Sequence, residues 1–71
     1  MSDNIYSVTE IYGSSRESID DAIRNAVQTA GETVHNTEWF QVSEIRGHIE
    51  DGKVAHFQVG VKIGFRYERS T

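Results

Sequence analysis

The dipeptide Asp51-Gly52 constrains the fold more than any other feature, because it separates two long segments of strand-forming residues. Aspartate followed by glycine favours the positive φ angles of a two-residue hairpin turn. After this turn, hydrophobic residues occupy every second position, which is the period of a strand with one buried face. These residues are Ala55, Phe57, Val59, Val61, Ile63, Phe65 and Tyr67. The sequence therefore predicts an antiparallel hairpin with arms at residues 39–50 and 53–68.

One strand and one amphipathic helix are predicted before the hairpin. Residues 5–12 are rich in β-branched and aromatic side chains, which favours a first strand that ends at Gly13. Ser14 stands three residues before Glu17, the spacing of a capping box, so we expect the helix to begin there and to end near Asn36. The hydrophobic residues at helical spacing are Ile19, Ala22, Ile23, Ala26, Val27, Ala30 and Val34.

The small size of the chain bears on how this fold is stabilised. The predicted order is β-α-β-β, an α+β fold in which a three-stranded antiparallel sheet packs on one helix. With 71 residues and no cysteine, a single domain of residues 1–71 has neither a disulfide nor a thiolate zinc site to reinforce its core. Burial of one face against other copies of the chain is the remaining source of stability, so we expect a homo-oligomer.

Charge and hydropathy exclude several classes of partner. Seven Lys and Arg against eleven Asp and Glu give a net charge of −4, the wrong sign for a protein that neutralises nucleic-acid phosphates. No apolar segment approaches the ~20 residues of a membrane helix. The first residues, Met1-Ser2-Asp3-Asn4, lack the basic and apolar parts of a secretory signal. We therefore expect a cytoplasmic protein whose partners are neither nucleic acids nor membranes.

The two-residue turn also predicts which residues face each other across the hairpin. The predicted pairs are Glu50 with Lys53, Ile45 with Gln58, and Trp39 with Gly64. An unbroken register would point Glu44 and Arg46 into the core, where an unpaired charge is strongly unfavourable. We therefore predict a bulge between Val42 and Arg46, which turns either Arg46 or Ile45 towards the opposite face.

One face of the predicted sheet carries residues suited to a flat ligand. Its residues are Trp39, Gln58, Gly60, Gly64 and Arg46, with His56, Lys62 and Arg66 nearby. Tryptophan offers a stacking plane, a glutamine amide matches the polar edge of a heterocycle, and arginines can hold a phosphate. Glycines in a strand favour either the close approach of a ligand or neighbour, or a bulge or bend. From the residues alone, a ligand-binding face and a subunit interface with Trp39 as its hot spot both stay open.

The three histidines give no indication of catalysis or metal binding. They are His35, His48 and His56, which lack the spacing of a metal motif and have no clear partner for proton transfer. His56 lies on the predicted binding face, where its protonation could tune binding near neutral pH. We therefore expect neither an enzyme nor a metal site.

Three segments of the chain resemble the dodecin family. They are residues 37–47 (TEWFQVSEIRG), 55–59 (AHFQV) and 61–66 (VKIGFR), and the resemblance runs from about Tyr6 to Glu68. Dodecins are small flavin-binding proteins whose subunits, each a three-stranded antiparallel sheet partly wrapped around a helix, assemble into a hollow homododecamer. The resemblance therefore implies the fold predicted above, in an assembly of twelve subunits.

The resemblance also implies a ligand and the residues that bind it. In dodecins, pairs of flavins stack between symmetry-related tryptophans, and a glutamine hydrogen-bonds the polar edge of the isoalloxazine; the matching residues here are Trp39 and Gln58. Arg46 matches an arginine that contacts flavin in bacterial members, and Arg66 matches one that approaches the phosphate of FMN. The resemblance thus implies an FMN-preferring protein, with riboflavin, FAD and coenzyme A as further candidate ligands. It implies flavin storage and photochemical quenching by the stacked tryptophan, without enzymatic activity.

Overall fold

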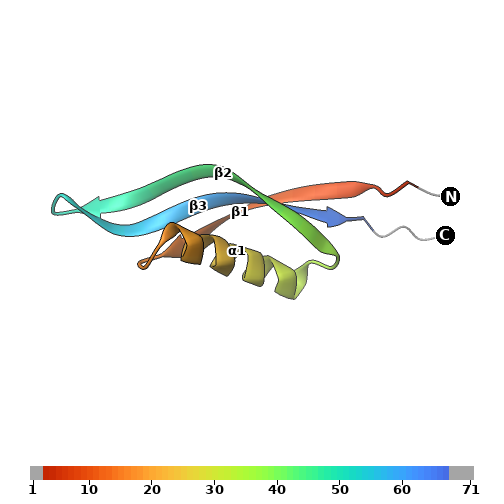
Figure 1. The fold of residues 1–71 in the computed structure, drawn as a ribbon, viewed down its shortest axis with the longest axis horizontal. Helices are drawn as coiled ribbons and strands as arrows, with labels where there is room; N and C mark the ends of the chain where they lie inside the picture. The colour runs from red at the N-terminus through yellow and green to blue at the C-terminus, as the bar shows by residue number, and fades with distance from the viewer. Residues whose placement is uncertain (1–2, 68–71) are drawn as a thin grey trace.

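The computed structural model describes residues 3–67, which form one sheet and one helix (Figure 1). The elements in chain order are β1 (Tyr6–Ser15), α1 (Ile19–Thr33), β2 (Thr37–Glu50) and β3 (Lys53–Arg66). The strands are antiparallel in the order β1-β3-β2, so the strand after the hairpin turn lies in the centre of the sheet. The predicted α+β class and the order β-α-β-β are confirmed. The last residue of the predicted hairpin arm, Glu68, lies outside the described residues.

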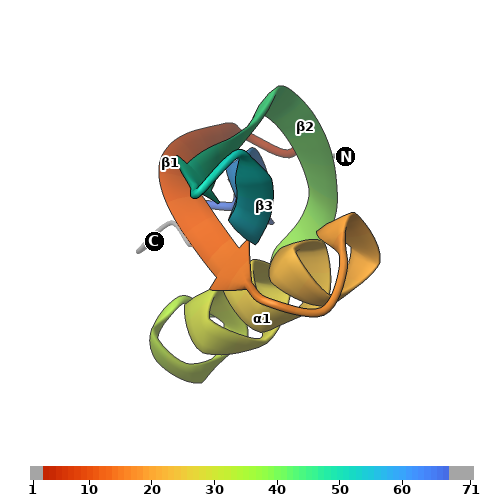
Figure 2. The same cartoon turned by 90° about the vertical axis from the view of Figure 1, so that its left-hand side faces the viewer.

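The core forms where α1 packs against the central strand (Figure 2). Its buried side chains are Val59, Val61 and Ile63 of β3 and Ala22, Ala26 and Ala30 of α1. Alanines on this side of the helix let its backbone approach the sheet closely, and a Cβ added at Gly13 of β1 would overlap the carbonyl oxygen of Ala22. The alternation in β3 and the helical spacing of the alanines thus predicted the centre of the core correctly. The prediction was wrong for Tyr67, which lies beyond the end of β3 and is 57% exposed.

The helix is shorter at both ends than the sequence predicted. Ser18 is its N-cap, and its hydroxyl accepts a hydrogen bond from the backbone N–H of Asp21 at 3.0 Å. The predicted start at Ser14 is wrong because β1 continues to Ser15, whose hydroxyl instead accepts from the backbone N–H of Glu17 at 2.9 Å. The helix ends at Thr33 rather than near Asn36, because the backbone of Val34 is already extended, with φ −111° and ψ 123°. Asn36, with a φ of 63°, then turns the chain into β2.

The hairpin turn has the conformation that its sequence predicts. Asp51 and Gly52 have φ angles of 53° and 73°, and Glu50 pairs with Lys53 across the turn. The arms of β2 and β3 continue past the N-terminal end of α1, so the described residues are elongated, with dimensions of 57 × 19 × 14 Å (Figure 1). The far part of the hairpin is therefore a two-stranded ribbon that no helix covers.

Three register shifts interrupt the hairpin: one leaves Glu38 without a partner at the start of β2, and the other two are bulges further along the strands. The predicted bulge between Val42 and Arg46 is confirmed, with Ser43 as the inserted residue of β2. A second bulge, which the sequence did not predict, inserts Ala55 in β3. The paired residues are Trp39 with Gly64, as predicted, and Ile45 with Val59 and Arg46 with Gln58. The predicted pairing of Ile45 with Gln58 is therefore wrong by one residue, and it is Arg46 that turns away from the core.

A single copy of the chain leaves much apolar surface uncovered. Within residues 3–67, the large hydrophobic side chains that are at least 42% exposed are Ile5, Tyr6, Val8, Tyr12, Trp39, Phe40, Ile45, Ile49, Val54 and Tyr67. A groove of about 610 Å³, lined in part by Ile23, Val27 and Phe40, runs between α1 and β2. In the described part of the chain, no helix combines the length and apolar character needed to cross a membrane. So much exposed apolar surface on so small a fold is the expected condition of a chain that associates with its own copies.

Candidate ligand-binding face

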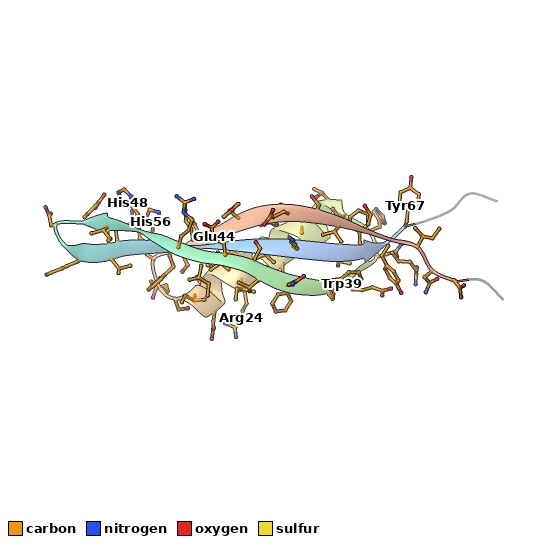
Figure 3. The ribbon with its side chains drawn as sticks, turned by 90° about the horizontal axis from the view of Figure 1, so that it is seen from above. Arg24, Trp39, Glu44, His48, His56 and Tyr67 are labelled. Atoms are coloured by element: carbon orange, nitrogen blue, oxygen red, sulfur yellow. The ribbon has the colours of Figure 1, made fainter. Side chains whose placement is uncertain are left out.

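The sheet face that points away from α1, which we call the outer face, carries the candidate ligand residues. In β3, alternate residues that are not part of the core point to this face, and their cross-strand partners in β1 and β2 share it. Figure 3 views this side of the molecule and shows Trp39, Glu44, His48 and His56 along it. The predicted residues Trp39, Gln58, Arg46 and Arg66 all belong to this face. The structure therefore places them on one surface, and the bulge at Ser43 is what brings Arg46 there.

Trp39 covers Gly64 with one face of its indole ring. A Cβ added at Gly64 would overlap three consecutive ring atoms, Cδ2, Cε2 and Cζ2, and a point that near to all three must lie above the ring plane. Tyr6 packs against the indole edge-on, with ring centroids 5.2 Å apart and an interplanar angle of 66°. Trp39 is nevertheless 42% exposed. One face of the indole is thus seated on backbone, while part of the ring remains available for stacking.

Gly60 has the same relationship to a second aromatic residue. A Cβ at Gly60 would stand 3.0 Å from Cε2 of Tyr12 and 2.8 Å from Oγ of Ser43. The two glycines of the outer face therefore seat the protein's own side chains, and neither presents bare backbone to a ligand. This differs from the sequence-based interpretation, in which the glycines let a ligand lie directly on the strand.

Tyr12 and Ser43 hold two carboxylates in the middle of the outer face. The Tyr12 hydroxyl donates to Oε1 of Glu44 at 2.6 Å, and the Ser43 hydroxyl donates to Oε2 of Glu10. The hydrogen bond to Glu44, together with the charge of that carboxylate, raises the pKa of Tyr12 above its ordinary value. The phenol therefore stays protonated across the neutral range. These contacts tie all three strands together on the exposed side of the sheet.

Gln58 and Arg46 face each other at some distance from Trp39. They form a cross-strand pair between β3 and β2, and Gln58 is half-buried. Trp39 pairs with Gly64, which is six positions along β3 from Gln58, so about 20 Å of strand separates the two sites at 3.3 Å per residue. This distance exceeds the length of a tricyclic ring system. A tricyclic ring stacked on Trp39 does not span this length of strand, so the outer face presents the two residues as separate parts of a site.

Arg66 lies at the Trp39 end of the sheet. Its Nη1 is 3.6 Å from Oε2 of Glu38, the residue that precedes Trp39, and both side chains are partly exposed. Exposed ion pairs of this kind contribute about 0–1 kcal/mol, so little is lost when an arginine exchanges its partner. The ion pairs formed within residues 3–67 do not include Arg46. Both guanidinium groups are therefore accessible to an anionic group.

The sequence did not reveal several members of the outer face. Tyr6 packs on Trp39, Tyr12 lies over Gly60, and Glu44 accepts a hydrogen bond from Tyr12, but none of the three was a candidate in the sequence. A signal for the tyrosines does exist, since Tyr12 pairs with Gly60, and an aromatic side chain commonly covers a glycine on the neighbouring strand. To find this signal, one must know the register between β1 and β3. These strands are neighbours in the sheet, but the helix and β2 lie between them in the sequence, so no turn fixes their pairing.

Together, the fold and this face define a class of protein: a small three-stranded sheet packed on one helix, with a half-exposed tryptophan on the opposite side. The sequence model of the Dodecin family matches residues 5–68. The chain belongs to the dodecin family, which confirms the resemblance drawn from its motifs.

Individual relatives agree with this assignment over nearly the whole chain. The dodecin of Thermus thermophilus is 38% identical over 66 residues, which are 93% of this chain and 96% of that protein. The dodecin structure from Streptomyces coelicolor is 53% identical, with a TM-score of 0.92 over 99% of this chain and 100% of that one. The structure of the dodecin from Streptomyces davaonensis is 48% identical, with a TM-score of 0.90 over 96% of this chain and 100% of that one. The predicted fold is therefore that of known dodecins.

Proposed function

We propose that the protein binds and stores flavin, with FMN as the preferred ligand, and quenches the excited flavin through Trp39. Membership of the dodecin family supports flavin binding as the general function. The proposed role of Trp39 rests mainly on one observation: its indole packs over Gly64 and remains partly exposed on the outer face. The proposed setting is a cytoplasmic homododecamer, and the proposed activity is binding without catalysis.

The seating of Trp39 suits the proposed photochemistry. Gly64 and Tyr6 hold the indole from two sides, so it is a preorganised plane on which an isoalloxazine can stack. The electron-rich indole would supply one electron to an excited flavin held in van der Waals contact. Return of that electron to the indole would restore the ground states of both rings. Because no bond forms or breaks, the cycle dissipates light energy without consuming the ligand.

The polar contacts to the ring and phosphate would come from three other residues of the outer face. The amide of Gln58 offers a donor and an acceptor to the isoalloxazine edge, and Arg46 lies directly across from it. The separation of about 20 Å between Gln58 and Trp39 supports a site shared between copies of the chain. Arg66, in its weak ion pair with Glu38, can exchange that carboxylate for the FMN phosphate. Riboflavin lacks the phosphate that these arginines would bind, and FAD carries a larger headgroup than FMN. Coenzyme A is a further candidate ligand for the same cationic groups.

Two variants of Trp39 test the quenching directly. Trp39→Phe keeps an aromatic plane but removes the readily oxidised indole, whereas Trp39→Ala removes both. We expect the phenylalanine variant to bind FMN with restored flavin fluorescence, and the alanine variant to bind much more weakly. We expect both variants to fold, since Trp39 lies outside the buried core, and circular dichroism is the measurement that checks this. Full quenching by a Trp39→Phe variant that still binds FMN would remove the indole from the mechanism.

Gln58 and the two arginines are tested through the choice of ligand. Gln58→Ala should weaken the binding of both FMN and riboflavin by about 1–3 kcal/mol, because a buried hydrogen bond to the ring is lost. Arg46→Ala and Arg66→Ala should weaken FMN binding more than riboflavin binding, because only FMN carries the phosphate. Equal losses for the two ligands in the arginine variants would contradict the FMN preference.

A second candidate function is a structural or interaction oligomer in which the outer face is a protein interface. Its supporting observation is an apolar row across the sheet, in which Val8 and Trp39 both pair with Gly64 and Tyr6 packs on the indole. Tryptophan is also a frequent hot spot of protein interfaces. This function predicts an assembled protein that is colourless and leaves flavin fluorescence unchanged.

A further inference from the structure

Arg46, one of the cations of the proposed flavin site, has an acidic neighbour with which it forms no ion pair. Glu44 precedes Arg46 by two residues on the outer face of β2, so their Cα atoms are about 7 Å apart along the strand. Side chains as long as those of glutamate and arginine can meet across this distance. Neither of the ion pairs formed within residues 3–67 includes Arg46 or Glu44. In this part of the chain, something other than Arg46 therefore holds the carboxylate of Glu44.

A tyrosine from the opposite edge of the sheet binds this carboxylate. Tyr12 of β1 reaches across the central strand, and its hydroxyl donates to Oε1 of Glu44 at 2.6 Å. This is the length of a charge-assisted hydrogen bond between a hydroxyl and a carboxylate, which is stronger than a bond between neutral groups. Glu44 is thus engaged across the sheet with Tyr12 rather than along β2 with Arg46.

Gly60 of β3 makes room for this contact. Tyr12 and Glu44 both pair with Gly60, one from each neighbouring strand, so the three residues form one row across the sheet. A Cβ at Gly60 would stand 3.0 Å from Cε2 and 3.2 Å from Cζ of Tyr12, closer than ordinary van der Waals contact. A larger side chain would occupy the space through which the phenol passes to Glu44. The bare strand at Gly60 and the hydrogen bond of Tyr12 therefore belong to one arrangement.

We propose that Tyr12 is a positioning residue: by binding Glu44, it keeps that carboxylate from neutralising Arg46 and leaves the guanidinium free for the anionic group of the ligand. This inference rests on the proposed function, in which Arg46 favours FMN over riboflavin through the phosphate. The hydrogen bond to Glu44 and the charge of that carboxylate raise the pKa of Tyr12, whereas the charge of Arg46 lowers it in part. The guanidinium is therefore within electrostatic range of the bonded pair.

A second hydroxyl–carboxylate bond on the outer face provides a matched control. The Ser43 hydroxyl donates to Oε2 of Glu10, so this bond also joins β1 to β2 across β3. Glu10 pairs with Lys62 of β3 and does not neighbour Arg46 on its strand. If these bonds served only to tie the strands together, the loss of either hydroxyl would have similar consequences. The positioning role predicts that only the Tyr12 hydroxyl affects the binding of a phosphate.

The test measures the affinities of full-length variants for FMN and for riboflavin by isothermal calorimetry. Tyr12→Phe keeps the ring but removes the hydroxyl, so Glu44 is free to pair with Arg46. Because an exposed ion pair is favoured over its open form by up to about fivefold, FMN binding should weaken by about two- to fivefold, with riboflavin binding unchanged. Glu44→Gln should restore FMN affinity in this background and have a smaller effect in the wild type, where Tyr12 already holds the carboxylate. Ser43→Ala should bind both ligands as the wild type does.

Unchanged FMN affinity in Tyr12→Phe, or a loss that Glu44→Gln does not reverse, would overturn the inference and leave flavin binding by the wild type intact. A wild type that binds no flavin would instead contradict the proposed function. Crystal structures of the ligand-free wild type and Tyr12→Phe variant give a readout that does not depend on flavin. A Glu44 carboxylate that turns to within about 4 Å of the Arg46 guanidinium in the variant supports the positioning role, and one that stays in place overturns it.

Discussion

The substitution Gly64→Ala tests whether the absence of a side chain at this position is what seats Trp39. The added Cβ would overlap the indole, so the ring must leave the strand or the strands must separate. Because Trp39 is 42% exposed, somewhat more than half of its surface is covered in the native structure. A buried tryptophan covers about 150–250 Å², so displacement of the ring exposes on the order of 100 Å².

This area gives the expected size of the effect. At about 25 cal/mol per Å², the exposure of 100 Å² removes about 2.5 kcal/mol of stabilisation. Alanine in place of glycine within a strand returns about 0.5–1 kcal/mol through the entropy of the unfolded chain. The net loss in the free energy of unfolding is therefore about 1.5–2 kcal/mol. Stability is compared by urea unfolding at equal chain concentration, since association of the chains makes stability depend on concentration.

The fluorescence of Trp39 provides a second readout, because it is the one tryptophan in the chain. A displaced indole should emit at longer wavelength and be more accessible to a soluble quencher such as acrylamide. Gly31→Ala is the control: a Cβ there meets nothing within 4 Å, and alanine favours the helix, so this variant should be slightly more stable. A Gly64→Ala protein with wild-type stability and an unchanged emission maximum would refute the reasoning.

Three further predictions concern the cap, the turn and the tyrosine. Ser18→Ala removes the hydroxyl that accepts from the N–H of Asp21, and it should lower the free energy of unfolding by about 0.5–2 kcal/mol in urea titrations. Gly52→Ala should lower it by about 1–2 kcal/mol in the same assay, because the φ of 73° is unfavourable for alanine. Tyr12 should ionise at higher pH than a free tyrosine, measured by absorbance at alkaline pH, and Glu44→Gln should lower its pKa again. Because the pKa is raised in the folded state, the associated stabilisation is present below the ordinary tyrosine pKa and is lost as the pH rises through the raised one.

Local patterns in the sequence were sufficient to predict the architecture. The alternation in β3 and the turn at Asp51-Gly52 each depend on residues close together in the chain. The turn is confirmed, and the alternation is confirmed from Phe57 to Phe65 but is interrupted by the bulge at Ala55. The start of the helix was less certain because several serines occupy neighbouring positions. Ser14 and Ser18 both satisfy a capping pattern, and the choice between them depends on how far β1 extends along the sheet.

The site was predictable in its residues but not in its geometry. The alternation placed Trp39 and Gln58 on one face, as the structure does, while the inferred bulge left Arg46 and Ile45 as alternatives for a third residue there. The structure shows that it is Arg46. The bulge at Ala55 escaped prediction because no local sequence signal distinguishes an inserted residue from a paired one in a continuous strand. For the same reason the pairing of His48 with His56 was not foreseen. The 20 Å between Trp39 and Gln58 follows from the pairing of Trp39 with Gly64, yet its consequence depends on how copies of the chain assemble.

The measurement that tests the central claim most directly is a titration of FMN fluorescence with the purified protein, alongside the mass of the assembly by light scattering. The account predicts strong quenching that saturates on a dodecamer, and little quenching by the Trp39→Phe variant at saturation. An assembled oligomer that leaves FMN fluorescence unchanged would contradict it, and would leave the Trp39 face as an interface between proteins.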